Sequence, residues 1–213
     1  MTTAPWDPAQ YLKFADERAR PVLDLLARVP AETPQTVFDL GCGPGNVTAL
    51  LARRWPGARV IGVDRSEAML IEARAHHPGI EFVAADLATF RPEAPADVIV
   101  ANAALHWLSG HAGLFPALVR ALAPNGALAV QMPHADDQPS HVLMAESAKS
   151  GPWRAKALAA LPRYPDHAPA DYYGWLAGVC RTVDIWETVY LHALAGDNAV
   201  LEWMKGAALR ALL

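Results

Sequence analysis

The sequence predicts an α/β fold, a doubly wound and mostly parallel sheet with helices on both faces. Short apolar runs bounded by turn residues alternate with longer segments of helical apolar spacing. One run, residues 98–101, is apolar at four successive positions, as in a strand buried on both faces. A glycine-rich turn at residues 41–45 joins the first apolar run of this region to a helical segment.

Length and composition favour one soluble domain. The chain has 213 residues, of which 53% are hydrophobic and 19% charged, so a full core is possible and a disordered protein is excluded. A formal charge of −4 lacks the basic footprint of a nucleic-acid-binding protein. The first 16 residues do not read as a leader peptide, and no apolar run reaches the ~18 residues of a membrane helix. We therefore predict no nucleic-acid partner and no membrane partner.

The two cysteines agree with a cytoplasmic location. Cys42 and Cys180 are far apart and show neither CxxC nor zinc-type spacing. No disulfide framework and no thiolate metal site is predicted, and a reducing compartment suits such a chain.

The elements follow in order along the chain. Two short helices are expected first, over 8–19 and 21–28, the second opened by a proline that suits a first helical turn. The core then alternates strands over 36–40, 59–64, 81–85, 97–102 and 126–132 with helices over 46–54, 66–75 and 113–122. Prolines crowd residues 133–170, which predicts an irregular lid. Residues 183–191 alternate as in a strand, and 197–213 have helical spacing.

The glycine-rich turn carries the strongest functional signal. It lies between a strand and a helix, where glycine permits a sharp turn and close approach of a ligand. Asp64 ends the second strand, where a carboxylate can accept hydrogen bonds from ribose hydroxyls. An ordinary tight connection is the alternative for the turn alone, but together these residues predict a site for a nucleotide-like cofactor.

The residues around the turn discriminate between two cofactors. A dinucleotide site favours a third glycine where this chain has Asn46. Asp39 places a carboxylate beside the turn, which suits the ammonium group of a methionine moiety and would repel a pyrophosphate. S-adenosylmethionine is therefore the predicted cofactor.

Two further strand ends carry candidate residues. Asp86 could accept a hydrogen bond from an adenine amine while Leu87 packs on the ring, although Asp86 could equally cap the following loop. Asn102 ends the fourth strand, and small residues lead from it to His106 and Trp107. For His106 alone, a core histidine bonded to backbone is the alternative.

The ordered motifs DLGCGPGN, GVDRS, AADL, NAALHW and PNGALAVQMP, within residues 36–133, resemble the class I S-adenosylmethionine-dependent methyltransferases, which have a Rossmann-like fold. Residues 6–30, 131–146 and 183–194 resemble the branch that methylates a small tricarboxylic acid. The class closes its sheet with an antiparallel strand pair. Only 183–191 is a candidate for it here, so the C-terminal antiparallel part of the sheet is expected to be incomplete.

The resemblance implies methyl transfer to a carboxylate oxygen of an acid such as trans-aconitate, giving a monomethyl ester and S-adenosylhomocysteine. It implies one methyltransferase domain with four parts: an N-terminal helical cap (1–30), a cofactor-binding core (36–132), a substrate lid (133–180) and a C-terminal strand and helix (181–213). The candidate catalytic residue is His106. The candidate cofactor residues are Asp39, Gly41, Gly43, Asp64, Arg65, Met69, Asp86, Leu87, Asn102 and Ala103.

The other carboxylates of such a substrate need cations or hydrogen-bond donors. Arginine is the side chain best shaped to bind a carboxylate through two hydrogen bonds. The candidates are Tyr11, Arg18, Arg20, Trp107, Arg154 and Tyr173. Solvated surface charge is the alternative for Arg18 and Arg20, since both follow Asp16 and Glu17.

Three other functions remain open at this point. The methyl acceptor could be a phenol, an amine or a fatty acid, because methyltransferases for these acceptors differ only in the lid and the N-terminal helices. The chain could be a non-catalytic module that binds the cofactor. A nicotinamide-dependent reductase is disfavoured by Asn46 and by the lack of a Tyr-x-x-x-Lys motif.

Overall fold

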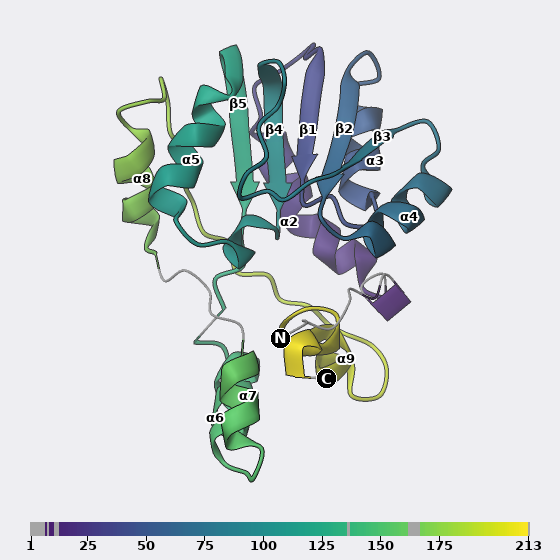
Figure 1. Ribbon diagram of the computed structural model, residues 1–213, viewed down its shortest axis with the longest axis vertical. Helices are drawn as coiled ribbons and strands as arrows, with labels where there is room; N and C mark the ends of the chain where they lie inside the picture. The colour runs from purple at the N-terminus through teal and green to yellow at the C-terminus, as the bar shows by residue number, and fades with distance from the viewer. Residues whose placement is uncertain (1–6, 8, 11–12, 136, 162–166, 213) are drawn as a thin grey trace.

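The computed structural model describes residues 7, 9–10, 13–135, 137–161 and 167–212. Its centre is a five-stranded sheet with helices on both faces, which confirms the predicted fold class (Figure 1). The strands are β1 (Thr36–Leu40), β2 (Arg59–Asp64), β3 (Glu81–Ala84), β4 (Ala96–Asn102) and β5 (Leu122–Gln131). Within the described ranges, no helix is both long and apolar enough to cross a membrane.

All strand pairs are parallel, and the order across the sheet is β3-β2-β1-β4-β5. The chain therefore builds outward from β1 in one direction and then returns to the other side of β1 with β4. The carboxyl ends of the strands all point to one edge, which faces down in Figure 1.

Alternation along the strands sorts the core into two layers. Val37, Val60 and Val98 pack on one face with α2 (Ala15–Ala27) and α3 (Asn46–Arg54). The next residue of each strand, such as Phe38 or Ile99, faces the opposite layer, which includes α5 (His111–Arg120). Both faces are therefore buried, as the apolar run in β4 predicts.

The edge of the sheet next to β3 has its own small core. Leu70 and Ala73 of α4 (Glu67–His76) pack with Phe82 of β3. Ser66 begins this helix as predicted, and its hydroxyl accepts a hydrogen bond from the Met69 N–H at 3.5 Å. This anchors the helix that follows Asp64.

The predicted break between the two N-terminal helices, just before Pro21, is wrong. Residues 15–27 form one helix, α2, that continues through Pro21. Proline inside a helix removes one backbone hydrogen bond. The helix persists because Val22, Leu25 and Leu26 bury against the sheet, and packing outweighs local propensity. The predicted helix over 8–19 falls partly outside the described residues.

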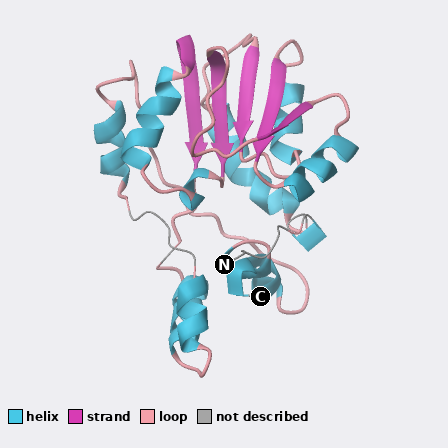
Figure 2. Cartoon of the chain, in the orientation of Figure 1, coloured by secondary structure: helices cyan, strands magenta, loops and turns pink. Residues whose placement is uncertain are grey.

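The irregular structure predicted for residues 133–170 is wrong, because this region is largely helical, whereas its role as a lid over the substrate stays a prediction. It contains α6 (Pro139–Lys149), α7 (Arg154–Ala160) and α8 (Pro169–Leu176). Two of its prolines occupy the first helical turn, where a missing N–H costs nothing. The helices α6 and α7 pack as a hairpin below the carboxyl edge, whereas α8 lies beside α5 (Figure 2).

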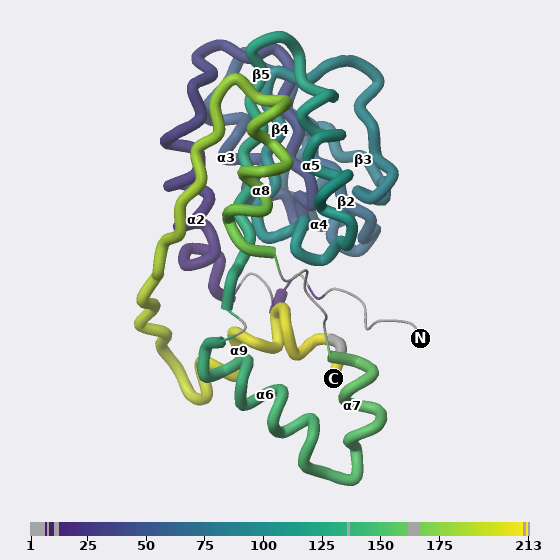
Figure 3. Tube along the Cα trace, turned by 90° about the vertical axis from the view of Figure 1, so that its left-hand side faces the viewer, coloured from purple at the N-terminus to yellow at the C-terminus, as the bar shows by residue number. Residues whose placement is uncertain are grey.

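The strand predicted over 183–191 is absent from the sheet. The segment is extended and runs along α2, as Figure 3 shows, without pairing to a described strand. Side chains hold it there. Asp184 accepts a hydrogen bond from Arg28 at 2.8 Å, and the Tyr190 hydroxyl donates to Asp24 at 2.6 Å. The alternating polarity of residues 183–191 therefore arises from contact with a helix and not from pairing with a neighbouring strand.

The chain ends in two short helices, α9 (Ala199–Lys205) and η2 (Ala208–Leu212), where helical spacing is predicted. The aromatic ring of Trp203 in α9 stacks at a tilt on Phe14, 5.5 Å between centroids. The C-terminal helices therefore pack against the start of α2, below the carboxyl edge of the sheet in Figure 1.

Candidate functional site

The strand order places a topological switch point, called the crevice here, on the carboxyl edge between β1 and β4. The connections from β1 and β4, neighbours in the sheet, leave in opposite directions. In open α/β sheets, ligands bind where this reversal separates the loops. The candidate cofactor residues follow β1, β2, β3 and β4, so the topology gathers them at this edge.

The glycine turn after β1 lies against the loop after β4. Gly41 has φ +77°, and a Cβ added to it would be 2.3 Å from the Ala104 Cβ and 3.6 Å from the Leu87 Cδ1. Three loops therefore meet at Gly41, and only glycine fits both the backbone conformation and the space.

Asp64 connects the glycine turn to the helix after β2. Its Oδ2 accepts the Gly43 N–H at 2.9 Å, and its Oδ1 accepts the Ser66 N–H at 2.8 Å. Each carboxylate oxygen retains a second acceptor position. The side chain is only partly buried, so Asp64 can orient the turn and still accept hydrogen bonds from a ligand.

Asp39 lies deeper in the fold than the other two acidic candidates, Asp64 and Asp86. It shares a strand face with Val37, and this face is covered by α3. The side chain is 1% exposed, and its Oδ2 accepts a hydrogen bond from the Thr48 hydroxyl of α3 at 2.6 Å. Burial raises the pKa of Asp39 to about 7, while the Thr48 hydrogen bond opposes that rise and Asp64 adds to it.

We expect Asp39 to make stability depend on pH. In the unfolded chain this carboxyl ionises near pH ~4, whereas folding raises its pKa to about 7. Its contribution to stability is full below pH ~4 and is lost as pH rises toward 7. Relative to Asp39→Asn, the wild-type free energy of unfolding should fall by up to about 1.4 kcal/mol per pH unit in this window.

Denaturant titrations of both proteins from pH 4 to pH 8 measure that difference. The asparagine keeps an acceptor for Thr48, so the comparison isolates the ionisation. Parallel stability profiles for the two proteins would show that Asp39 is already charged in the folded protein.

Asn102 and Ala103 end β4 at the crevice. Asn102 is 9% exposed, and its Oδ1 accepts no hydrogen bond from the described residues. Ala103 has φ +51°, a conformation that costs a non-glycine residue roughly 1–3 kcal/mol and recurs at functional sites. An unpaired buried acceptor beside a strained backbone fits a ligand that donates a hydrogen bond there.

The remaining cofactor candidates frame this crevice less tightly. Asp86 is exposed, and its Oδ1 accepts the Ala88 N–H at 2.9 Å, so it caps the turn after β3. Leu87 contacts the glycine turn as described above. Met69 is 3% exposed in the core, and Arg65 is exposed at the rim. A role of these residues in cofactor binding stays a prediction.

His106 and Trp107 lie in the short helix η1 (Leu105–Trp107), directly after the β4 loop. Their rings are 4.7 Å apart between centroids. His106 is 7% exposed, and burial, with a smaller contribution from His111, lowers its pKa to about 4. The imidazole is therefore neutral at physiological pH and can act as a hydrogen-bonding group rather than a cation.

The substrate candidates are not gathered in one place. The Arg18 guanidinium donates to the Trp203 carbonyl at 3.1 Å and lies over the Trp203 ring. Arg20 lies over the Tyr190 ring. Arg154 begins α7 in the lower hairpin, and Tyr173 is exposed on α8, beside α5 (Figure 1). Tyr11 lies outside the described residues.

Two polar residues near the site have no counterpart among the predicted site residues. Thr48 binds Asp39, and His111 binds the loop that contains His106. Thr48 is a polar side chain among the apolar positions of the predicted helix over 46–54, and that mismatch is a signal in the sequence that could have found it. His111 lies two residues before the predicted helix over 113–122, so the helical pattern gives no such signal for it.

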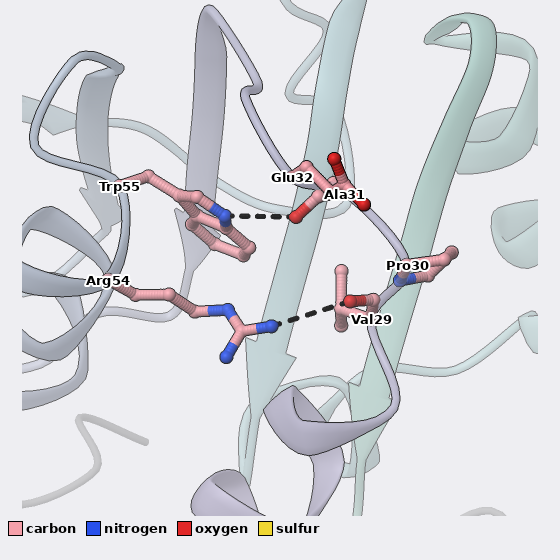
Figure 4. Close-up of a pocket in the computed structure, with 6 residues that line it drawn as sticks. All are labelled: Val29, Pro30, Ala31, Glu32, Arg54 and Trp55. Atoms are coloured by element: carbon pink, nitrogen blue, oxygen red, sulfur yellow. Dashed lines mark hydrogen bonds between the residues drawn. The ribbon is translucent and has the colours of Figure 1, made fainter.

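Two surface cavities lie away from this crevice. One, of about 480 Å³, is lined by residues 29–32 together with Arg54 and Trp55, near the amino end of β1 (Figure 4). The Trp55 indole donates to the Ala31 carbonyl there at 3.1 Å. The other, of about 630 Å³, lies between α6, α7, α9 and η2. Neither is lined by a predicted cofactor residue, so the site follows from topology and chemistry.

The parallel sheet, the glycine turn and the acceptors at the switch point define a class I S-adenosylmethionine-dependent methyltransferase. A family model described as a methyltransferase domain matches residues 37–126. The chain is 53% identical over 99% of its length to the trans-aconitate 2-methyltransferase of Methylobacterium nodulans, covering 82% of that protein. It is 51% identical over 98% to that of an Azoarcus species, covering 81%. The chain belongs to the trans-aconitate 2-methyltransferase family.

Solved structures agree on the fold. A methyltransferase in complex with the Haloferax volcanii Trm112 methyltransferase activator aligns with a TM-score of 0.63 at 19% identity, over 80% of this chain and 72% of that one. Coclaurine N-methyltransferase, solved with N-methylheliamine and S-adenosylhomocysteine, aligns with a TM-score of 0.52 at 20% identity, over 62% and 46%. At these identities the likeness concerns the fold alone.

Proposed function

We propose that this methyltransferase transfers a methyl group from S-adenosylmethionine to a carboxylate oxygen of trans-aconitate. The products are a monomethyl ester and S-adenosylhomocysteine. The observation that carries the proposal is the extent of the match to the trans-aconitate enzymes. Identity of about half continues over nearly the whole chain, far beyond the methyltransferase domain at residues 37–126.

The crevice suits the cofactor. When bound, S-adenosylmethionine supplies a methyl group activated by the positive sulfonium. Asp64, at the end of β2, offers acceptor positions for ribose hydroxyls. Asn102, at the end of β4, offers an Oδ1 that accepts no hydrogen bond from the described residues. The glycine turn leaves backbone exposed for close approach, since a Cβ at Gly43 would meet nothing within 4 Å.

Methylation of a carboxylate requires no general base, and this agrees with a His106 that is neutral at physiological pH. A carboxylic acid with a pKa of roughly 4 is already ionised at neutral pH, so the reaction needs no general base. The protein has to align the oxygen, the methyl carbon and the sulfur, which can contribute ~7–11 kcal/mol. A neutral, buried His106 can donate a hydrogen bond to the carboxylate and need not act as a base, because the carboxylate carries no proton.

A transfer assay tests this function. We expect methyl-labelled S-adenosylmethionine to give base-labile product with trans-aconitate, and little or none with cis-aconitate, isocitrate or decanoate. A methyl ester is cleaved by mild base, whereas a methylated amine or phenol is not. Label on decanoate or on a phenol would replace trans-aconitate as the acceptor. Tight cofactor binding without transfer to any acceptor would support a non-catalytic module.

We also propose a cytoplasmic location, with small molecules as the only partners the reaction requires. Cys42 and Cys180 are free thiols among the described residues, which suits a reducing compartment. The formal charge of −4 does not favour a nucleic-acid partner, since such partners are usually bound by basic proteins.

A further inference from the structure

His111 is a buried polar residue whose two ring nitrogens contact two different parts of the chain. It is the first residue of α5 and is 1% exposed. Its Nε2 lies 2.9 Å from the Leu105 carbonyl oxygen, and its Nδ1 lies 2.7 Å from the Tyr172 hydroxyl. A buried imidazole with both nitrogens engaged has a fixed orientation.

The partners determine the tautomer. A carbonyl oxygen only accepts, so the Nε2 carries the proton and donates to Leu105. In the neutral ring the Nδ1 then accepts, and the Tyr172 hydroxyl donates to it. Burial lowers the pKa of His111, nearby His167 adds to this, and the Leu105 hydrogen bond opposes it. Burial and Asp171 raise the pKa of Tyr172, so the hydroxyl keeps its proton.

One end of this connection lies in the candidate site. Leu105 begins η1, the helical turn that contains His106 and Trp107. Its carbonyl is held by the side chain of His111, six residues along the chain. Together with the Leu108 N–H, which donates to the same carbonyl at 2.9 Å, this hydrogen bond fixes the backbone of the turn that contains both predicted site residues.

The other end of this connection is Tyr172, in α8, which follows the hairpin of α6 and α7 in the sequence. The hairpin of α6 and α7 is inserted between β5 and α8. Tyr172 of α8 packs on Phe115 of α5 at 4.9 Å and on Trp175 at 5.1 Å, between ring centroids. Aromatic packing and one hydroxyl thus anchor the return of the lid next to the site turn.

We propose that His111 and Tyr172 are positioning residues for the methyl-transfer reaction. Through paired hydrogen bonds on one imidazole they fix the turn containing His106 and Trp107 relative to the anchored end of the lid. This inference rests on the proposed function, because it assigns a catalytic consequence to that contact. It assigns no contact of His111 or Tyr172 with the cofactor.

Conservative variants separate the two hydrogen bonds. Tyr172→Phe removes only the hydroxyl, and we expect kcat with trans-aconitate to fall roughly threefold to tenfold, as for one lost hydrogen bond. His111→Gln keeps a donor near the Nε2 position, and we expect a similar loss. His111→Asn keeps an acceptor near the Nδ1 position but leaves the Leu105 carbonyl only its hydrogen bond from the Leu108 N–H, so a larger fall, of roughly tenfold or more, is expected.

The affinity for S-adenosylmethionine should stay within about twofold of the wild type in all these variants, because the two hydrogen bonds position residues that face the methyl acceptor and not the cofactor. Tyr190→Phe is the matched control, since it also loses a hydroxyl hydrogen bond, to Asp24 at 2.6 Å, but on the α2 side of the fold. It should keep the wild-type kcat. Combined, His111→Gln and Tyr172→Phe should cost less than the product of the single effects, since both break the same contact.

A second measurement keeps this inference separate from the identity of the acceptor. In ¹⁵N-histidine NMR spectra, His111 should show a protonated Nε2 and an unprotonated Nδ1, and Tyr172→Phe should shift the resonances of His106. Wild-type protein that methylates no acid would count against the proposed function only. A Tyr172→Phe variant with wild-type kcat, or with unmoved His106 resonances, would overturn the positioning role.

Discussion

Alanine in place of Gly41 should weaken the binding of S-adenosylmethionine by roughly 100-fold and abolish most methyl transfer. The added Cβ would lie 2.3 Å from the Ala104 Cβ, and the backbone at φ +77° is itself unfavourable for alanine by roughly 1–2 kcal/mol. The Ala104 Cβ is fixed to the backbone and cannot rotate away, so the loop after β1 or the loop after β4 must move. Isothermal titration with the cofactor measures the loss.

Gly196→Ala is the control for backbone strain. Gly196 also has a positive φ, of +100°, but an added Cβ there would meet nothing within 4 Å. It should lose some stability and keep its cofactor affinity. Equal affinities for the Gly41→Ala variant and the wild type would mean that the loops after β1 and β4 can separate without cost, and the site would have to be sought elsewhere.

The second large effect is expected at Asp64. Asp64→Ala removes the acceptor for two backbone N–H groups, those of Gly43 and Ser66, and any hydrogen bond to the ribose. Hydrogen bonds to a charged group contribute ~1.5–3 kcal/mol each, so cofactor affinity should fall roughly 10-fold to 100-fold. Asp64→Asn keeps one acceptor oxygen, so its affinity for the cofactor should lie between that of the wild type and that of Asp64→Ala.

Asp97 offers a close match for the control. Its Oδ2 also accepts two backbone hydrogen bonds, from Gln35 at 2.7 Å and Thr36 at 2.9 Å, but at the amino end of the sheet. Asp97→Ala should therefore lower the melting temperature and leave the cofactor affinity unchanged. If Asp64→Ala behaved in the same way, Asp64 would be a structural residue and not part of the cofactor site.

The sequence predicts the sheet well because local signals and burial agree there. β1 and β2 have the predicted bounds, and β3 and β4 differ by one residue at one end. The apolar runs are short and punctuated, and those of β1, β2 and β4 are buried on both faces, so one pattern satisfies strand propensity and packing together. The cofactor residues follow the strand ends, and the parallel order places them on one edge.

Side-chain partners between distant segments could not be predicted in this way. Nothing local to Tyr172 identifies His111, 61 residues away, as the acceptor of its hydroxyl. The segment over 183–191 has strand alternation, but whether it joins a sheet depends on which backbone lies next to it. In α2, the same limit applies to Pro21, since the helix continues through it only because of the core it covers.

The segment over 183–191 is held to the rest of the protein by side-chain contacts, and this makes its backbone accessible to a protease. Residues 181–197 form no backbone–backbone hydrogen bond within the described parts of the chain, and Val189 is 97% exposed. Cleavage requires only that an exposed, extended backbone enter the protease, so among the residues that the structure describes we expect nicking first in this segment. Its amides should exchange with deuterium faster than those of the sheet, and a nicked protein would retain the complete cofactor edge of the sheet.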